Sequence, residues 1–171
     1  SPFPIPENII LALKNNANKN KYLPIQGLEE LRSAIATYLN NENNNFTADD
    51  ILIGPGSKEL MLLAHIAFDG EILLPAPSWV SYQPQARIAD NKVHWIQTSI
   101  DTNWFPTAEQ IKNKIENIKS KNLLLLLNSP NNPSGTVCKN LKEIAEICKK
   151  YKITILSDEI YSHLTFQQKY Q

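Results

Sequence analysis

A pair of neighbouring carboxylates stands near the end of the sequence, in the segment Ser157–Tyr161 (Ser-Asp-Glu-Ile-Tyr), directly after an apolar run. A carboxylate beside a buried strand is unfavourable unless it finds a partner. Asp158 is therefore a candidate to pair with a protonated ring nitrogen of a ligand, and Tyr161 is close enough in sequence to reach the same ligand. The alternative is a strand that simply leaves the core toward solvent.

A second loop with candidate chemistry is Ser129–Gly135 (Ser-Pro-Asn-Asn-Pro-Ser-Gly), which follows a run of five leucines. Its two prolines restrict the path of the backbone. Asn132 precedes Pro133 and is therefore kept out of the helical region, so its amide can point into a cleft. A turn built from common turn-forming residues is the alternative.

A third candidate is Gly54–Lys58 (Gly-Pro-Gly-Ser-Lys), between a predicted strand and a predicted helix. Backbone amides at the start of a helix have no partner within the helix and can bind an anion. Gly56 would allow a close approach, and the Ser57 hydroxyl adds a donor, so the turn could hold a phosphate. The spacing matches neither the dinucleotide fingerprint nor the P-loop. A plain strand-to-helix turn is the alternative.

An indole follows another apolar run, at Trp79 in the segment Pro75–Trp79 (Pro-Ala-Pro-Ser-Trp). Beside a cleft, an indole can stack on a flat heteroaromatic ring. Taken alone, an indole in this position is more often a core or rim residue.

Five short apolar runs separated by helix-like segments are the elements that would position these motifs. They predict βαβ units, and hence an α/β protein with a mostly parallel sheet and helices on both faces. The predicted strands are Ile51–Ile53, Glu71–Leu74, Val93–Gln97, Leu123–Leu127 and Ile153–Leu156. The leucine run lacks polar alternation, as expected for a strand buried on both faces. All four motifs would then follow the carboxyl ends of strands, where open α/β sheets bind ligands.

The helices carry their own start signals. Thr107 with Gln110, and Asn140 with Glu143, match the capping-box pattern. The segment 57–68 is apolar nearly all round and is predicted to lie deep in the core.

A polar turn is predicted to divide the chain. Residues 28–38 form an amphipathic helix pattern, and the polar stretch 40–45 follows it. We therefore expect an N-terminal helical segment at residues 1–44 and a sheet domain at residues 45–171.

The composition of the 171 residues is that of an ordinary globular protein, with 42% hydrophobic residues. Lys+Arg and Asp+Glu number 17 each, so no basic field favours nucleic acid or acidic membranes. The first residues show no charged-then-apolar pattern, so no secretory signal is expected. Cys138 and Cys148 are expected to be reduced, which suits the cytoplasm. The three histidines, which match no metal-ligand pattern, are His65, His94 and His163.

The motifs together resemble one family, the PLP-dependent aminotransferases of fold type I, class I/II, where PLP is pyridoxal 5'-phosphate. The matching blocks occur in the family's order. They are Tyr22–Arg32, Gly56–Lys58, Pro75–Trp79, Asn131–Gly135 and Ser157–Tyr161. The most specific are Asn-Pro-Ser-Gly and Asp-Glu-x-Tyr. The resemblance implies that residues 45–171 are part of the PLP-binding large domain.

The resemblance also implies roles for single residues. Asp158 would pair with the pyridine nitrogen of PLP, and Trp79 would stack on the ring. Tyr161 and Asn132 would hydrogen-bond its phenolic oxygen, with Asn132 also near the substrate carboxylate. The residues implied to hold the phosphate are Gly56, Ser57 and Lys58. Tyr22 resembles the tyrosine that reaches the phosphate of a neighbouring subunit, which implies a homodimer.

The family's Schiff-base lysine has no counterpart in these residues. Lys169 is too close in sequence to Asp158 to be that lysine. We therefore expect the Schiff-base lysine to lie beyond Gln171 and the chain to be inactive alone. A PLP-dependent lyase or decarboxylase of the same fold is one alternative to an aminotransferase. A non-catalytic PLP-binding regulatory module is a second, and an isolated folding unit a third.

Overall fold

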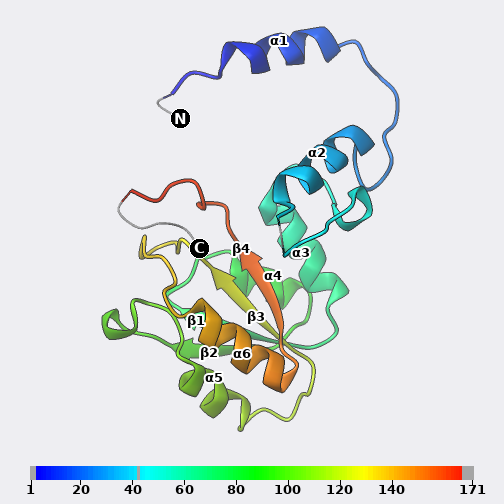
Figure 1. The fold of residues 1–171 in the computed structure, drawn as a ribbon. Helices are drawn as coiled ribbons and strands as arrows, with labels where there is room; N and C mark the ends of the chain where they lie inside the picture. The colour runs from blue at the N-terminus through cyan, green and yellow to red at the C-terminus, as the bar shows by residue number, and fades with distance from the viewer. Residues whose placement is uncertain (1–2, 42, 167–171) are drawn as a thin grey trace. The chain divides into compact units, whose positions relative to one another are not determined.

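The chain is divided by its contacts into two compact units, Ser1–Gly54 and Pro55–Gln171. The structure is a computed structural model, and it describes residues 3–41 and 43–166. Figure 1 shows the helices and strands of each unit in chain order. The predicted division into an N-terminal helical segment at residues 1–44 and a PLP-binding sheet domain at residues 45–171 stays a prediction.

The first unit contains α1 (Glu7–Asn16), α2 (Glu29–Leu39) and the 3₁₀ turn η1 (Ala48–Asp50). The helix predicted at residues 28–38 is confirmed as α2, whose buried residues are Arg32 and Ala36. The Arg32 guanidinium donates to the carbonyl of Ala48 at 2.6 Å. This partly buried hydrogen bond ties α2 to η1.

A tight approach between Gly27 and Ile53 links the turn before α2 to the segment after η1. Gly27 has φ +102°, and a Cβ added there would lie 2.6 Å from the Cβ of Ile53. Glycine is therefore required both by its backbone conformation and by its neighbour. Next to this contact, the Ile53 amide donates to the carbonyl of Gln26 at 2.9 Å.

The strand predicted at Ile51–Ile53 is wrong for the described chain. The segment pairs with no described strand, and the amide of Ile51 donates back to Ala48 of η1. A β-branched run forms a strand only when a neighbour accepts its ladder of hydrogen bonds. Consequently the Gly54–Lys58 motif does not follow a strand here, unlike the other three motifs.

The second unit is built on a parallel sheet with the strand order β2-β1-β3-β4. The strands are β1 (Glu71–Ala76), β2 (Val93–Gln97), β3 (Leu123–Asn128) and β4 (Thr154–Asp158). The other four predicted strands are thus confirmed. Every residue of β3 is buried, as predicted, because β1 and β4 flank it and helices cover both faces.

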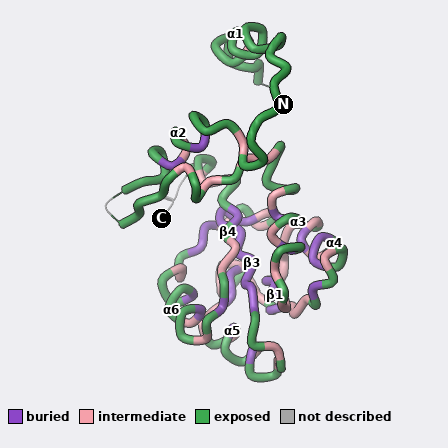
Figure 2. The backbone as a smooth tube through the Cα atoms, turned by 90° about the vertical axis from the view of Figure 1, so that its right-hand side faces the viewer, coloured by how far each residue is buried: buried purple, intermediate pink, exposed green. Residues whose placement is uncertain are grey.

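Helices cover both faces of the sheet, as Figure 2 shows with the buried strands between them. One face packs against α5 (Ala108–Ile115) and α6 (Leu141–Tyr151), and the other against α3 (Ser57–Ala67) and α4 (Tyr82–Ile88). Successive leucines of β3 point to opposite faces, so one strand feeds both cores. Burying one such side chain stabilises the fold by about 1.5–3 kcal/mol.

The helix α3 is less buried than predicted. Only Met61 and His65 are buried on it, while Leu63 is 45% exposed and Ile66 60% exposed. Met61 packs in the core beside the sheet, and α4 also contacts α3, while the exposed leucine and isoleucine lie outside these contacts.

Only one of the two predicted capping boxes is present. Thr107 accepts from the Gln110 amide at 3.1 Å, and the Gln110 side chain accepts from the Thr107 amide at 2.9 Å. The box at Asn140 and Glu143 is wrong, since Asn140 makes no side-chain cap. Its Nδ2 donates instead to the Pro106 carbonyl at 2.9 Å, which joins α6 to the turn before α5.

Both cysteines are free and buried in the core, which agrees with the expectation of reduced thiols. Burial raises the pKa of the Cys148 thiol to about 11, so the unreactive thiol form dominates at neutral pH. None of the helices in the described part of the chain has the length and apolar character needed to span a bilayer.

Candidate functional site

The carboxyl ends of three parallel strands and the start of α3 surround one cavity of about 90 Å³ in the second unit. Parallel strands end at a common edge of the sheet, so the loops that follow them converge there. The residues that line the cavity are Ser57, Trp79, Tyr82, Asn128, Asn132, Asp158, Ile160 and Tyr161.

Asp158 ends β4, and its side chain is held on both oxygens. The Tyr82 hydroxyl donates to Oδ2 at 2.7 Å, and the amide of Ile160 donates to Oδ1 at 3.2 Å. Asp158 is buried, with 8% of its surface exposed. Burying a carboxyl group is unfavourable unless hydrogen-bond donors meet its oxygens. The Tyr82 hydroxyl and the Ile160 amide supply those donors and hold the Asp158 side chain beside the cavity.

Tyr82 is the most deeply buried group of the site, at 1% exposure. Burial, followed by the hydrogen bond and the charge of Asp158, raises the pKa of Tyr82 far above its usual value near 10. Its hydroxyl therefore stays protonated and remains a donor to Asp158 throughout the physiological range.

The loop after β3 presents Asn132 through a network of short hydrogen bonds. The Asn132 amide donates to Oδ1 of Asn128 at 2.7 Å, and the Gly135 amide donates to the Asn131 carbonyl at 2.8 Å. Gly135 adopts φ +70°, a conformation that favours glycine. The peptide bond from Asn132 to Pro133 is cis. The loop is thus closed on itself, with Asn132 at the cavity.

The indole of Trp79 forms one wall of the cavity. Its ring meets Tyr82 edge to face, with 5.4 Å between centroids and an 82° angle between planes. The Lys58 ammonium lies 5.4 Å from the centroid of the indole, a cation–π distance. Gln85 Nε2 donates to the Lys58 carbonyl oxygen at 2.7 Å, and this hydrogen bond joins α4 to the start of α3.

The start of α3 leaves donors available. Among the described residues, the amides of Ser57 and Lys58 donate no hydrogen bond. Gly56 is extended, and a Cβ added there would meet nothing within 4 Å, so the space in front of the helix is open. Free amides at the N-terminus of an 11-residue helix suit an anion such as a phosphate.

Five of the predicted site residues meet at the cavity: Ser57, Trp79, Asn132, Asp158 and Tyr161. Gly56 and Lys58 lie beside it, on a neighbouring hollow between α3 and α4. Tyr22 belongs to the first unit, where it is fully exposed. Lys169 lies outside the described residues.

Three lining residues were missed by the sequence analysis, the polar residues Tyr82 and Asn128 and the apolar Ile160. Tyr82 stands one helical turn beyond Trp79, a spacing that could have indicated a shared surface. Asn128 is the first polar residue after five leucines, and a buried amide there signals specific partners.

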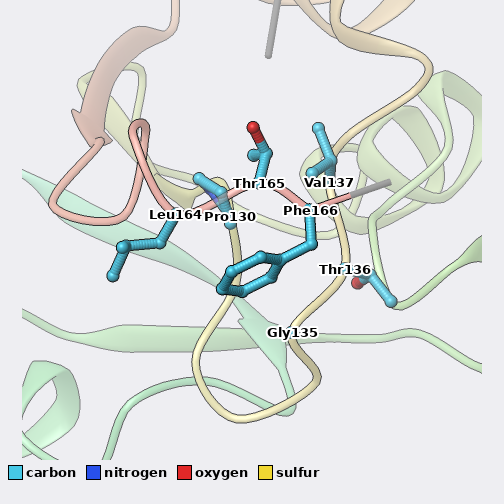
Figure 3. Close-up of a pocket in the computed structure, with 7 residues that line it drawn as sticks. All are labelled: Pro130, Gly135, Thr136, Val137, Leu164, Thr165 and Phe166. Carbon is cyan, nitrogen blue, oxygen red and sulfur yellow. The ribbon is translucent and has the colours of Figure 1, made fainter. Parts of the chain in front are cut away.

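A second hollow, of about 300 Å³, lies between the loop after β3 and the segment after β4. Figure 3 shows the side chains of Leu164 and Phe166 beside the loop that contains Gly135. This hollow is lined by no residue whose side chain was predicted to bind a ligand. Phe166, which does line it, is 93% exposed. Within the described residues, no group of three histidine, cysteine or acidic side chains could hold a metal ion.

Comparison with known proteins gives the family. The model of the family described as aminotransferase class I and II matches residues 2–171. The chain belongs to this family. One similar aminotransferase is a bifunctional aspartate aminotransferase and glutamate/aspartate-prephenate aminotransferase from Petunia hybrida, 38% identical over 97% of this chain and 35% of its own length. Another is an aspartate aminotransferase from Bacillus subtilis, 33% identical over 98% of this chain and 44% of its own length.

Solved aminotransferases share the fold. An aspartate aminotransferase from Thermus thermophilus with maleate has a TM-score of 0.87 and 29% identity, covering 98% of this chain and 45% of that protein. An aminotransferase from Escherichia coli has a TM-score of 0.88 and 28% identity, covering 99% of this chain and 43% of that protein. The chain thus spans less than half the length of these relatives. The α/β fold type I assignment is confirmed.

Proposed function

We propose that the full-length protein transfers an amino group between an amino acid and a 2-keto acid with PLP as its cofactor. One observation carries the proposal: a buried carboxylate, Asp158, shares a cavity with an indole and two hydrogen-bonding side chains. The aminotransferase family implies PLP. The parts of PLP correspond to the side chains of the site, because PLP has a ring nitrogen, a flat ring, a phenolic oxygen and a phosphate.

The chain's own residues would divide the work of binding PLP. Asp158 would hold the ring nitrogen protonated, and Trp79 would pack on the ring. Asn132 and Tyr161 would donate to the phenolic oxygen. Ser57, together with the open amides at the start of α3, would hold the phosphate with Gly56 and Lys58 beside it. Bound in this way, PLP supplies an electron sink for the bonds at the amino acid's α-carbon.

An acidic substrate is the specific form of this proposal. Relatives of the chain are named aspartate aminotransferase and aspartate/prephenate aminotransferase. We propose that the full-length protein also acts on dicarboxylic amino and keto acids, the substrates that those names imply. Asn132 would lie near the substrate carboxylate. The proposed setting is the cytoplasm, and the proposed assembly is a homodimer in which Tyr22 reaches the neighbour's phosphate.

The product of the reaction tests the proposal. The full-length protein with PLP, aspartate and 2-oxoglutarate is expected to form glutamate, measured by amino-acid analysis. Release of CO₂ or ammonia without amino transfer would instead favour the lyase alternative. Borohydride reduction of the PLP complex should label a single lysine outside residues 1–171. Label on Lys58, close to Trp79, would contradict the proposal.

Two neighbouring carboxylates provide a matched pair of variants. Asp158→Ala removes the buried charge, so amino transfer should fall by roughly 10²-fold or more, while PLP still binds. Glu159 is exposed, and among the described residues its carboxylate accepts a hydrogen bond only from the Ser157 hydroxyl, at 2.8 Å, so Glu159→Gln should keep near-normal rates. Steady-state rates and the PLP absorbance spectrum check both. Equal rates in Asp158→Ala and the unaltered protein would remove the assignment.

A further inference from the structure

Asn128 stands where the buried leucine strand meets the site. It ends β3, is 4% exposed, and lines the cavity together with Asp158 and Asn132. A leucine would continue the apolar pattern of the strand at no desolvation cost. A buried amide instead must have both its donor and its acceptor satisfied.

The donor and the acceptor of the Asn128 side-chain amide both form hydrogen bonds to the backbone of residues that are proposed to bind PLP. Its Nδ2 donates to the Asp158 carbonyl at 2.9 Å, and its Oδ1 accepts from the Asn132 amide at 2.7 Å. Asp158 ends β4, whereas Asn132 lies in the loop after β3. One side chain therefore links the end of β4 to the loop after β3.

The two bonds are not equally replaceable. The Asp158 carbonyl also accepts from the Ser129 amide at 3.2 Å, so it keeps a partner without Asn128. The Asn132 amide has no other acceptor among the described residues. Asn132 lies in a turn outside the strands and helices, so no ladder bond holds its backbone.

We infer that Asn128 is a positioning residue, which sets the place of Asn132 relative to Asp158 through its side-chain amide. The inference rests on the proposed function, because the two positioned residues are those proposed to contact PLP. Asn128 acts through them and does not itself carry the chemistry.

Two substitutions in the full-length protein separate the two bonds. Asn128→Asp keeps an oxygen acceptor for the Asn132 amide and loses the donor to Asp158, whereas Asn128→Ala loses both. Asn122→Ala is the matched control, because Asn122 precedes the same strand at its other end and bonds to the Asp69 carbonyl.

Amide hydrogen exchange reports the geometry without depending on PLP. The Asn132 amide is expected to lose protection at least tenfold in Asn128→Ala and to keep it in Asn128→Asp and Asn122→Ala. Unchanged protection at Asn132 in Asn128→Ala would overturn the inference.

The affinity for PLP reports the consequence for the site. The dissociation constant for PLP should rise by roughly 10- to 100-fold in Asn128→Ala. This is the range typical of metal sites when the hydrogen-bond partner of a ligating residue is removed. Asn128→Asp should lie between that variant and the unaltered protein, and Asn122→Ala should match the unaltered protein. Lost protection with unchanged affinity would overturn the positioning role alone. A failure of the unaltered protein to bind PLP would instead overturn the proposed function.

Discussion

At the scale of single residues, the contact between Tyr82 and Asp158 couples the site to pH. The folded-state pKa of Tyr82 lies above its value in the unfolded chain, because burial and Asp158 favour the neutral phenol. The stability that this preference contributes is complete below the unfolded pKa near 10 and is lost as pH rises through the folded pKa.

Tyr82→Phe should therefore destabilise the protein most at neutral pH. The variant loses a buried hydrogen bond to a charged group, a loss of roughly 1.5–3 kcal/mol. The difference in unfolding free energy between the two proteins should shrink above pH 10, measured by urea denaturation from pH 7 to 11.

Tyr151→Phe is the control for this measurement, since the Tyr151 hydroxyl makes no hydrogen bond among the described residues. Its unfolding free energy should follow that of the unaltered protein at every pH. A constant gap for Tyr82→Phe across the range would mean that the phenol is not held neutral by folding.

At the scale of elements, local signals predicted the sheet better than the helix ends. The four confirmed strands are each bounded by turn residues and each find a parallel neighbour. Ile51–Ile53 has the same composition but no described neighbour, and pairing is not visible in a local pattern. The box at Asn140 failed for a similar reason, because a distant carbonyl, that of Pro106, competes for its amide.

The two capping-box patterns give a paired prediction at this scale. Gln110→Ala removes the acceptor for the Thr107 amide and should reduce the unfolding free energy by about 1 kcal/mol. Glu143→Ala should change it by less than about 0.5 kcal/mol, since no box forms there. Denaturant titration of both variants measures the difference, and equal losses would contradict the cap assignment.

Two glycines of the motifs should respond differently to a methyl group. Gly27→Ala forces a positive φ on alanine and a 2.6 Å contact with Ile53, so a loss of roughly 1–3 kcal/mol is expected. Gly56→Ala meets nothing within 4 Å and should change stability by less than about 1 kcal/mol. Thermal unfolding compares them, and a larger loss at Gly56 would be the contrary result.

At the scale of the whole molecule, the sequence could predict the family and the meeting of five site residues, but not the complete site. Motifs that follow parallel strands converge by topology alone, which is why Asp158, Asn132 and Trp79 were found. Asn128 and Tyr82 act through contacts made only after β3, α4 and β4 have packed together. Their positions in the sequence can indicate that Tyr82 and Asn128 are buried near the site, but no spacing rule identifies Asp158 as their partner.

The proposed homodimer is a prediction at the same scale. Tyr22 is fully exposed in this chain, as expected for a side chain whose proposed partner is another subunit. Light scattering of the full-length protein should give twice the mass of one chain. Tyr22→Phe should weaken PLP binding while leaving that mass unchanged, and a monomer that binds PLP normally would contradict the assembly.

The five consecutive leucines of β3 also make the unfolded chain prone to aggregation. Leu123–Leu127 has no charge, proline or glycine, and is harmless only while β1, β4 and four helices enclose it. The pairing of Glu71 with Leu123 joins residues far apart in sequence, and such contacts form slowly. During synthesis or heating, this segment is therefore the place where intermolecular β-sheet would begin.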